Sequence, residues 1–413
     1  MNSITILGLG YVGLPLALNL AKAGFPVKGF DPDKSKIESL NSFKSYINDI
    51  LDSEIELVTK NCNFSVDNNL IESGTYIVCV PTPLTNFGTS DVSMIKEAAK
   101  LISNVLKFGD LVILESSTYP GTTEEIFIPI LESKGLIAGK DFSVGYAPER
   151  VNPGSKTSYK EVNRVVSGLT NNCLEKVYTL YASICNVVYK CNSIKTAEVS
   201  KLLENSYRLV NISLINSLAK YCDEINVSVN DVIDSAKTKP FGYTPFYPSL
   251  GAGGHCIPID PIYLSEKMEE LNLDSSIIRS AQKTNIEMHI WIKDKINWLL
   301  RHKTGIKKIL IHGVTYKENV NDIRHSYAID LLKELMLQNK VEFFDPLVKK
   351  LSFNDSSIEG IENFEENLSN FDLILLNHSA SKRSFSTVVN KNLIVFDLQN
   401  PPLNLENVIY YKL

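Results

Sequence analysis

The 413-residue sequence lacks most of the features that mark specialised classes of protein. Its seven cysteines are odd in number and scattered, without a CxxC pair or the Cys/His spacing of a zinc site, which argues against a disulfide framework and a structural metal. No stretch reaches about 18 uninterrupted apolar residues, so we expect no membrane span. The first 20 residues have no basic segment before their apolar run and do not resemble a secretory signal. These absences favour a reducing, cytoplasmic location.

An excess of positive charge is also missing. The formal net charge is -5 and the isoelectric point is about 5.8, so the composition gives no indication of binding to nucleic acid or to an anionic membrane. Hydrophobic residues make up 44% and charged residues 22% of the chain, as in ordinary soluble globular proteins. A chain of this length is expected to form two or three domains.

A glycine-rich turn is present near the start of the chain. The run Gly8-Leu9-Gly10-Tyr11-Val12-Gly13 follows the β-branched residues 3–7 and precedes a segment of helical character, 14–23. Glycines at this spacing permit a tight turn that brings the pyrophosphate of a dinucleotide close to a helix N-terminus. The cofactor contacts expected from this turn are Gly8, Gly10, Tyr11, Val12 and Gly13.

A second predicted strand, 27–30, ends in an acidic residue. Asp31 lies 18 residues after Gly13, near the usual spacing of about 20 in a Rossmann unit. Its carboxylate is expected to accept hydrogen bonds from the ribose hydroxyls, and its charge would repel a 2′-phosphate, which favours NAD over NADP. Lys36, one helical turn further, is a second candidate for contact with the ribose.

Residues 76–80, 111–115 and 142–146 continue the strand pattern, with helical segments between them. This alternation predicts an α/β fold with a parallel sheet. Loops at the strand ends of such sheets carry ligand contacts. The residues of these loops expected to contact the cofactor are Pro81, Thr82, Ser117 and Thr118.

A long helix is predicted over 194–226, where apolar residues recur at helical spacing without proline. Such a helix suits a spine that joins two domains or pairs two subunits, and packing within its own chain is the alternative. A second α/β region begins near residue 307, where Asp345-Pro346 ends a strand as Asp31-Pro32 does, but it lacks the full glycine pattern of a second cofactor site. The sequence therefore predicts two Rossmann-like domains and a helical middle domain, bounded at 1–192, 193–303 and 304–413.

The most informative run is Gly251-Ala252-Gly253-Gly254-His255-Cys256-Ile257-Pro258-Ile259-Asp260. Its glycines allow bare backbone to approach a ligand, and a thiol follows at once. A thiol beside a nicotinamide cofactor can trap an aldehyde covalently and carry it on to the acid. The other six cysteines are expected to be small buried core residues.

These motifs occur in one order along nearly the whole chain, together with the runs 80–83, 117–123, Pro148-Glu149-Arg150, 201–205 and 317–324. In this order the chain resembles the UDP-glucose/GDP-mannose dehydrogenase family, NAD-dependent enzymes that oxidise the C6 alcohol of a nucleotide sugar to a uronic acid. The resemblance implies that the C-terminal domain binds the nucleotide sugar. The apolar stripe of the long central helix predicts a homodimer, with packing within its own chain as the alternative. The resemblance also implies that the product serves the synthesis of surface polysaccharide.

Two runs are similar to the branch of the family that acts on UDP-N-acetylhexosamines, 148–154 and 253–261. Members acting on UDP-glucose typically have serine at the position of His255 and a second glutamate at that of Pro153. The run 238–248 is most similar to the UDP-N-acetylglucosamine and UDP-N-acetylmannosamine enzymes. We therefore expect a UDP-N-acetylhexosamine as substrate, with UDP-glucose as the alternative and the epimer left open.

The resemblance assigns the first oxidation and the covalent step to three residues. Glu149 would take the proton of the C6 hydroxyl, directly or through water, while Lys201 would stabilise the developing oxyanion. Cys256 would attack the aldehyde. Lys201 is also the expected cation for the Cys256 thiolate, because His255 is expected to point away from the thiol.

A second hydride transfer would give a thioester. Its hydrolysis would use Asp260 and Asn205 to order water and move protons, with Thr118 assisting. Arg324 resembles the arginine that reaches the NAD site. The residues expected to contact the nucleotide sugar are Glu149, Arg150, Lys201, Asn205, Phe246, Tyr247, Gly253 and Lys317. No metal is expected, since the remaining histidines lack ligand spacing and are interpreted as structural.

Two other classes of protein fit part of the pattern. Dehydrogenases of the hydroxyacid or 6-phosphogluconate type share a Rossmann domain followed by a long helix, but they need no thiol, so Cys256 counts against them. An NAD-binding regulatory protein without activity would have lost catalytic groups, whereas every expected group is present in this chain.

Overall fold

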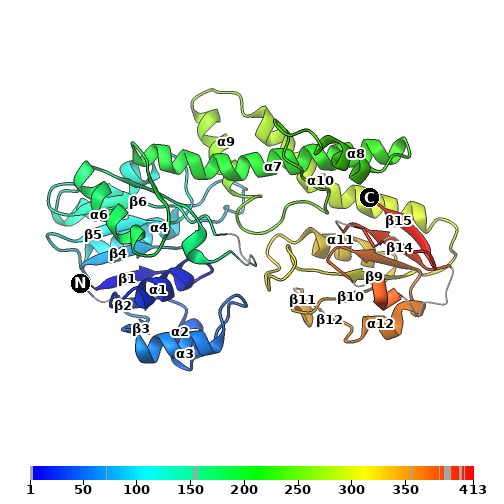
Figure 1. Ribbon diagram of the computed structural model, residues 1–413, viewed down its shortest axis with the longest axis horizontal. Helices are drawn as coiled ribbons and strands as arrows, with labels where there is room; N and C mark the ends of the chain where they lie inside the picture. The colour runs from blue at the N-terminus through cyan, green and yellow to red at the C-terminus, as the bar shows by residue number, and fades with distance from the viewer. Residues whose placement is uncertain are drawn as a thin grey trace. The chain divides into compact units, whose positions relative to one another are not determined.

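The computed structural model describes residues 3–70, 72–151, 154, 157–353, 356–380, 382–385, 392–399, 402–403 and 405–413. Two compact units make up the chain: Met1–Glu204 with Ile259–Asp274, and Asn205–Pro258 with Ser275–Leu413. Figure 1 shows a sheet in each, with strands from blue to cyan in the first and from yellow to red in the second. The division into three domains at the boundaries given above stays a prediction.

The first unit is built on an eight-stranded sheet of order β3-β2-β1-β4-β5-β6-β7-β8. Neighbouring strands are parallel except β6 and β7, which are antiparallel. The strands are β1 (Ile4–Leu7), β2 (Val27–Phe30), β3 (Phe64–Asp67), β4 (Thr75–Val78), β5 (Leu111–Leu114), β6 (Ser143–Tyr146), β7 (Arg164–Gly168) and β8 (Val188–Lys190). The helices are α1 (Gly13–Lys22), α2 (Lys34–Asn41), α3 (Asp52–Asn61), α4 (Ser93–Ser103), α5 (Ile128–Leu131), α6 (Asn171–Ala182) and α9 (Asp260–Glu270).

The central strands β1, β4 and β5 are buried at every position. Their continuous apolar runs are typical of parallel strands that helices cover on both faces. Two hydrophobic clusters accordingly fill this unit, one including Leu14 and Leu18 of α1 and the other Ile95 and Ile102 of α4. The strands that follow β1 are added first on one side of it, as β2 and β3, and then on the other side, beginning with β4. Ligands of such sheets bind beside the carboxyl ends of the strands at this switch point between β1 and β4.

The second unit contains a five-stranded parallel sheet of order β10-β9-β13-β14-β15 and a hairpin of β11 and β12. The strands are β9 (Lys308–His312), β10 (Lys340–Phe344), β11 (Lys350–Ser352), β12 (Ser357–Glu359), β13 (Leu373–Leu376), β14 (Ile394–Asp397) and β15 (Ile409–Lys412). The helices are α8 (Val229–Ala236), α10 (Ser276–Leu299), α11 (Tyr327–Met336) and α12 (Phe364–Asn367).

The predicted likeness between the two α/β regions is present in the backbone. Gly8 after β1 has φ +93° and Gly313 after β9 has φ +92°, a conformation that favours glycine. Asp31 accepts a hydrogen bond from the Leu9 amide, and Asp345 accepts one from the Val314 amide. Both sheets thus fix the turn after their first strand with a carboxylate from the next strand, which confirms the predicted fold class.

The predicted long helix is α7 (Ile194–Glu224), which is 31 residues long and contributes to both units. Within the described residues, no helix combines the length and the apolar character needed to cross a membrane. The cytoplasmic location stays a prediction.

Candidate active site

The glycine turn after β1 is sterically closed on one side and open on the other. A Cβ at Gly13 would lie 1.8 Å from the Gly8 carbonyl oxygen, and one at Gly8 would lie 2.6 Å from the Cys79 oxygen. Among the described residues, nothing lies within 4 Å of a Cβ at Gly10. The backbone around Tyr11 and Val12 therefore leads into α1 with open space at Gly10, which fits the approach of a pyrophosphate.

Asp31 and Lys36 lie together beside this turn. The Asp31 carboxylate accepts hydrogen bonds from the amides of Leu9, at 2.9 Å, and Asp33, at 3.0 Å. The Lys36 ammonium is 2.8 Å from Asp31 Oδ2. The two predicted ribose contacts are therefore one ion pair, and Asp31 also shapes the glycine turn itself.

The two predicted strand-end loops of the first unit are joined by a hydrogen bond. The Ser116 hydroxyl donates to the Val80 carbonyl oxygen at 2.7 Å. Pro81 lies three residues after the end of β4 and Ser117 three residues after the end of β5, at the carboxyl ends of adjacent parallel strands, and Thr82 follows Pro81. These predicted cofactor contacts thus lie on the edge of the sheet that carries the glycine turn.

Glu198 on α7 holds the loop that contains Thr118, and nothing in the sequence singled it out. Its buried carboxylate accepts hydrogen bonds from the Gly121 amide at 2.7 Å and from the Thr123 amide and hydroxyl at 3.0 and 2.7 Å. Thr118 is buried, and its hydroxyl donates to Thr122 at 2.7 Å. Glu198 lies one helical turn before Lys201, so one helix carries both the support of the loop and the predicted cation.

Glu149 is held by an arginine that sequence reasoning missed. Its Oε2 lies 2.6 Å from the guanidinium of Arg164, whose side chain is fully buried at the start of β7. Its Oε1 accepts from the backbone amides of Arg150 and Val151 at 2.7 and 2.6 Å. Both carboxylate oxygens of the predicted base therefore have protein donors.

A second buried carboxylate, Glu115, shares the same arginine. It lies 3.9 Å from the Arg164 guanidinium and accepts hydrogen bonds from the Tyr181 hydroxyl and, at 3.8 Å, the Cys79 thiol. Burial raises the pKa of Glu115 to about 7, with Arg164 opposing the rise and Glu149 adding to it. These buried side chains therefore connect Glu149, in the loop after β6, to Cys79 directly after β4, the strand that pairs with β1.

Other predicted residues of the first unit lie on or beside α7. Arg150 forms an ion pair of 2.6 Å with Glu204 and donates to the Asn163 carbonyl oxygen at 3.0 Å. Lys201 is half-buried on the same helix, and Asp260 is buried as the first residue of α9. Pro153, which separated the two branches of the family in the sequence, is outside the described residues.

In the second unit, the loop before Cys256 is fixed to α10 by a single side chain. Asn285 Oδ1 accepts from the Ala252 amide at 2.7 Å, and Asn285 Nδ2 donates to the Ala252 carbonyl oxygen at 3.0 Å. Nδ2 also donates to the Tyr327 hydroxyl at 3.2 Å. Asn285 thus satisfies both peptide groups of one buried loop residue, much as a neighbouring strand would.

The glycines of this loop let it pack against the segment that follows β9. A Cβ at Gly253 would lie 2.4 Å from the His325 carbonyl oxygen, and one at Gly254 would lie 2.7 Å from the Tyr316 ring. The Gly254 amide donates to the Arg324 carbonyl oxygen at 3.2 Å. Close contact with the His325 carbonyl oxygen and with the Tyr316 ring therefore explains these two glycines.

His255 lies between the Cys256 thiol and two charged residues. Its Nδ1 is 3.8 Å from Asp322 Oδ2 and 3.2 Å from the Arg324 guanidinium, and the Cys256 side chain is a hydrogen-bond partner of the ring. The expectation that His255 points away from the thiol is therefore wrong. In the sequence His255 is adjacent to Cys256, but adjacency does not determine the rotamer of the histidine side chain.

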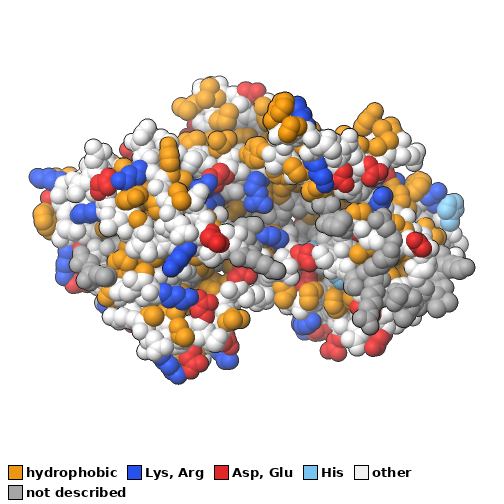
Figure 2. All heavy atoms as spheres, in the orientation of Figure 1, with side chains coloured by type: hydrophobic (Ala, Val, Ile, Leu, Met, Phe, Trp, Pro, Cys, Tyr) orange, Lys and Arg blue, Asp and Glu red, His pale blue; other side chains and the backbone are white. Residues whose placement is uncertain are grey.

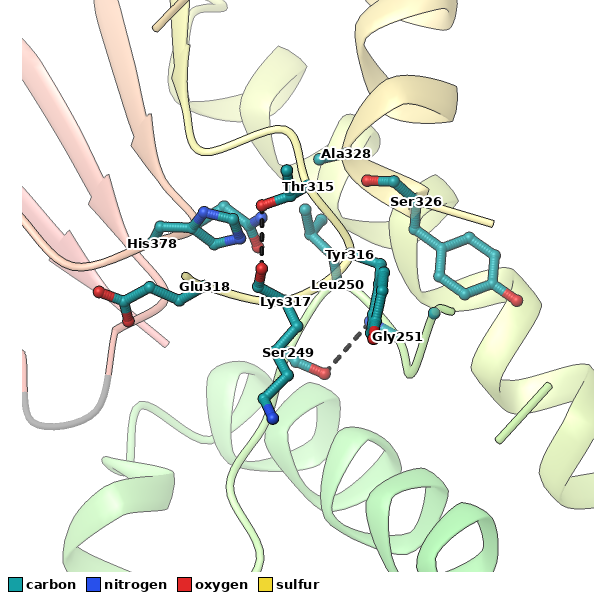
Figure 3. Close-up of a pocket in the computed structure, with 13 residues that line it drawn as sticks. Ser249, Leu250, Gly251, Thr315, Tyr316, Lys317, Glu318, Ser326, Ala328 and His378 are labelled. Atoms are coloured by element: carbon teal, nitrogen blue, oxygen red, sulfur yellow. Dashed lines mark hydrogen bonds between the residues drawn. The ribbon is translucent and has the colours of Figure 1, made fainter. Parts of the chain in front are cut away.

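A pocket of about 170 Å³ opens beside this loop, at the carboxyl ends of β9 and β13. Gly253 and Lys317, both predicted to contact the nucleotide sugar, line it. Figure 3 shows the Lys317 side chain extending past Ser249, while its carbonyl oxygen accepts from the Thr315 hydroxyl at 2.9 Å. His378, interpreted as structural from the sequence, lines the same pocket.

The remaining predicted residues of this unit have packing contacts. Phe246 makes an edge contact with Tyr207 of α7 at 5.8 Å between ring centroids. Tyr247 is partly buried against the hydrophobic cluster of the second unit, which includes Met288. Asn205 is buried on α7. Arg324 is about half exposed and pairs with Asp322 at 2.6 Å.

Figure 2 shows Lys and Arg side chains mixed with Asp and Glu over the face drawn. No group of three or more His, Cys, Asp or Glu side chains in the described part of the chain is placed to hold a metal ion.

Three models of the UDP-glucose/GDP-mannose dehydrogenase family match: the NAD binding domain at residues 2–185, the central domain at 195–287 and the UDP binding domain at 310–401. The pocket residues from Thr315 to His378 lie within the last match. The first match confirms NAD as the cofactor and an oxidoreductase as the class of enzyme.

Individual relatives cover most of the chain. A UDP-N-acetyl-D-glucosamine 6-dehydrogenase from Salmonella typhi is 36% identical, over 84% of this chain and 82% of the relative. A UDP-N-acetyl-D-mannosamine dehydrogenase from Methanocaldococcus jannaschii is 32% identical, over 96% and 92%. The solved structure of a UDP-D-ManNAc dehydrogenase from Pyrococcus horikoshii is similar, with TM-score 0.87, 29% identity and coverage of 99% and 98%. With all three family domains matched in order, the chain belongs to the UDP-glucose/GDP-mannose dehydrogenase family.

Proposed function

We propose that the protein oxidises the C6 alcohol of a UDP-N-acetylhexosamine to the uronic acid in two NAD-dependent steps, with Cys256 as the covalent carrier. The observation that carries this proposal is the loop of residues 251–256. Gly251 and Gly253 of this loop line the pocket that is shared with residues matching the UDP-binding model, and the loop ends in a thiol next to a histidine. A dehydrogenase that stops at the aldehyde has no use for this thiol.

The relatives support an N-acetylated sugar over glucose. The names of two relatives that cover more than four fifths of this chain specify UDP-N-acetyl-D-glucosamine and UDP-N-acetyl-D-mannosamine. His255 stands where the branch that acts on UDP-glucose typically has serine. UDP-glucose is therefore the second candidate, and the epimer is decided by assay.

The chemistry proposed for the first oxidation starts at the C6 hydroxyl. When bound, NAD accepts a hydride from C6 in each of the two oxidations. The hydroxyl proton passes to Glu149, directly or through a water, and the protein donors to both Glu149 oxygens hold this carboxylate in position. The Lys201 ammonium stabilises the negative charge that develops on oxygen.

The covalent step then uses Cys256. Its sulfur attacks the aldehyde carbon, a C–S bond forms, and the electron pair of the C=O bond moves to oxygen, which takes up a proton from water to give a thiohemiacetal. After the second oxidation, a water ordered by Asn205 and Asp260, with Thr118 assisting, attacks the thioester. The C–S bond breaks, and the acid leaves with the thiol restored.

We also propose a homodimer formed through α7. Exposed apolar side chains are spaced along this helix and recur on α10: Leu203, Tyr207, Leu214, Tyr221, Ile277, Ile286 and Ile290. An unpartnered apolar stripe of this kind suits a second copy of the chain, because a two-fold axis pairs one stripe with itself. Sedimentation of the purified protein tests it, and replacing Leu214 and Tyr221 by glutamate is expected to give monomers.

The covalent scheme is tested by Cys256→Ser, with Cys62→Ser as the control at another half-buried thiol. We expect acid formation to fall by several orders of magnitude in Cys256→Ser and to stay unchanged in Cys62→Ser. In wild-type protein quenched during turnover, mass spectrometry should find the sugar on the peptide of Cys256. Undiminished four-electron oxidation by Cys256→Ser would contradict the scheme.

A further inference from the structure

Tyr263 on α9 is bonded through its hydroxyl to the loop that follows β4. The side chain is 1% exposed, and its oxygen accepts a hydrogen bond from the Asp91 amide at 3.1 Å. The hydroxyl lies 2.9 Å from the Pro83 carbonyl oxygen and 3.0 Å from that of Asp91, and it can donate to either. Main-chain groups of one loop therefore use both capacities of this hydroxyl, to accept and to donate.

α9 contacts the loops after β4 and β5 at further points. One helical turn after Tyr263, the Glu266 carboxylate accepts from the Ser90 amide, at 3.2 and 3.1 Å from its two oxygens. The Tyr263 ring lies 6.0 Å from the Tyr119 ring between centroids, and the Lys267 ammonium lies 4.2 Å from the Tyr119 centroid. Tyr119 belongs to the loop after β5. One helix is thus attached to both strand-end loops that carry predicted cofactor contacts.

The helix that makes these contacts begins at a residue assigned to the chemistry. Asp260 is buried at the first position of α9, one helical turn before Tyr263. In the sequence it follows Cys256 by four residues. Because one turn of helix is short and held by its own packing, the position of the Tyr263 side chain fixes the position of Asp260.

We propose that Tyr263 is a positioning residue that couples NAD binding to the placement of Asp260. When the loops after β4 and β5 contact NAD they are held in one position, and the Tyr263 hydroxyl then holds the first turn of α9 in the same way. The inference deepens the proposed function and rests on its assignment of Asp260 to the hydrolysis of the thioester. Coupling of this kind is reciprocal, so loss of the hydroxyl also weakens NAD binding.

The test compares Tyr263→Phe with Tyr76→Phe in the full-length protein. Both substitutions remove only a buried hydroxyl that is bonded to a main-chain amide, since the fully buried Tyr76 accepts from the Ser73 amide at 2.9 Å. Ser73 precedes β4, so this control bond lies at the end of the sheet opposite to the glycine turn. Calorimetric titration measures NAD affinity without sugar. Mass spectrometry measures hydrogen exchange of the peptide 259–266 with and without saturating NAD.

We expect the Kd for NAD to rise about three- to tenfold in Tyr263→Phe and to stay unchanged in Tyr76→Phe. Saturating NAD should slow exchange of the peptide in wild type and in Tyr76→Phe, and this protection should be lost in Tyr263→Phe. Unchanged protection in Tyr263→Phe overturns the proposal, and so does an equal loss of affinity in Tyr76→Phe. Far-UV circular dichroism checks folding. If Tyr263→Phe does not fold, Glu266→Ala carries the test with the same expected results, because it removes the acceptor of the Ser90 amide.

The outcome is separate from that of the proposed function, since no sugar is present in either measurement. Loss of the protection in Tyr263→Phe, with no oxidation of any UDP-sugar by the wild-type protein, refutes the proposed function and retains the coupling of α9 to NAD. Four-electron turnover by wild type with unchanged protection in Tyr263→Phe refutes the coupling alone.

Discussion

The Arg164 guanidinium lies 2.6 Å from Glu149 Oε2, and its side chain has no exposed surface. The same group donates to the Pro148 carbonyl oxygen at 3.3 Å, so it fixes both the backbone and the carboxylate of the loop after β6. A charge buried this deeply is tolerated only with its partners in place. Arg164 therefore sets the position of Glu149 before any ligand binds.

Removing Arg164 should destabilise the fold. Arg164→Met leaves two buried carboxylates without their cation, which is expected to lower the free energy of unfolding by about 3–5 kcal/mol. The matched control is Arg150→Met, because the Arg150–Glu204 pair is about one third exposed at both ends and is expected to contribute about 0–1 kcal/mol. Urea unfolding measures both, and equal losses in the two variants would contradict the account.

The raised pKa of Glu115, about 7, gives stability a defined pH dependence. In the unfolded chain this carboxyl has the ordinary pKa of 4.5, so between these values the folded protein binds a proton that the unfolded chain has released. The contribution of Glu115 is thus complete below about pH 4.5 and is lost as pH rises through 7, by up to about 1.4 kcal/mol per pH unit.

Glu115→Gln stays neutral at every pH and so tests this dependence. The stability of the variant relative to wild type should rise between about pH 5 and pH 7.5, as measured by urea unfolding at each pH. A difference that is flat over this interval would show that Glu115 titrates normally or stays ionised throughout.

Two glycines of the first turn should separate folding from cofactor binding. A Cβ at Gly13 has no room beside the Gly8 oxygen, so Gly13→Ala should lower both the melting temperature and NAD affinity. Gly10→Ala meets open space and should fold normally, yet weaken NAD binding at least about tenfold because its methyl occupies the approach of the pyrophosphate. Calorimetric titration with NAD checks this, and wild-type affinity in Gly10→Ala would contradict it.

Asn285 should affect the rate through the position of the loop that carries Cys256. Asn285→Asp keeps the shape but cannot donate to the Ala252 oxygen, and Asn285→Ala loses both bonds, so kcat should fall about 10- to 100-fold in each. Asn367→Ala, which removes a partly exposed helical side chain that donates to the Asn363 carbonyl oxygen, is the control and should keep the wild-type rate. Steady-state kinetics measures kcat in all three variants.

Local patterns were enough to predict the elements that carry the site. The strand predicted at 27–30 coincides with β2, and the helix predicted over 194–226 is α7, two residues shorter. Short peripheral strands were missed, among them β3, β7 and β15, because three to five residues of mixed polarity give no clear period. The antiparallel pairing of β6 with β7 was missed with them.

The residues missed in the site share one property: their partners are distant in sequence. Glu198 bonds a loop 75 residues away, and Asn285 bonds Ala252 across 33 residues. Arg164 did carry a signal, since a charged residue opening an apolar strand must find a partner if it is buried. The identity of that partner depends on which strands become neighbours, and the local sequence does not contain it.

The central claim is tested most directly by the yield of NADH per sugar. Purified protein is supplied with limiting UDP-GlcNAc, UDP-ManNAc, UDP-GalNAc or UDP-glucose in separate reactions with excess NAD. The account predicts two NADH per molecule of one N-acetylated sugar, with the corresponding uronic acid as the product. One NADH per sugar would contradict the four-electron reaction, and turnover of UDP-glucose alone would contradict the assignment of the substrate.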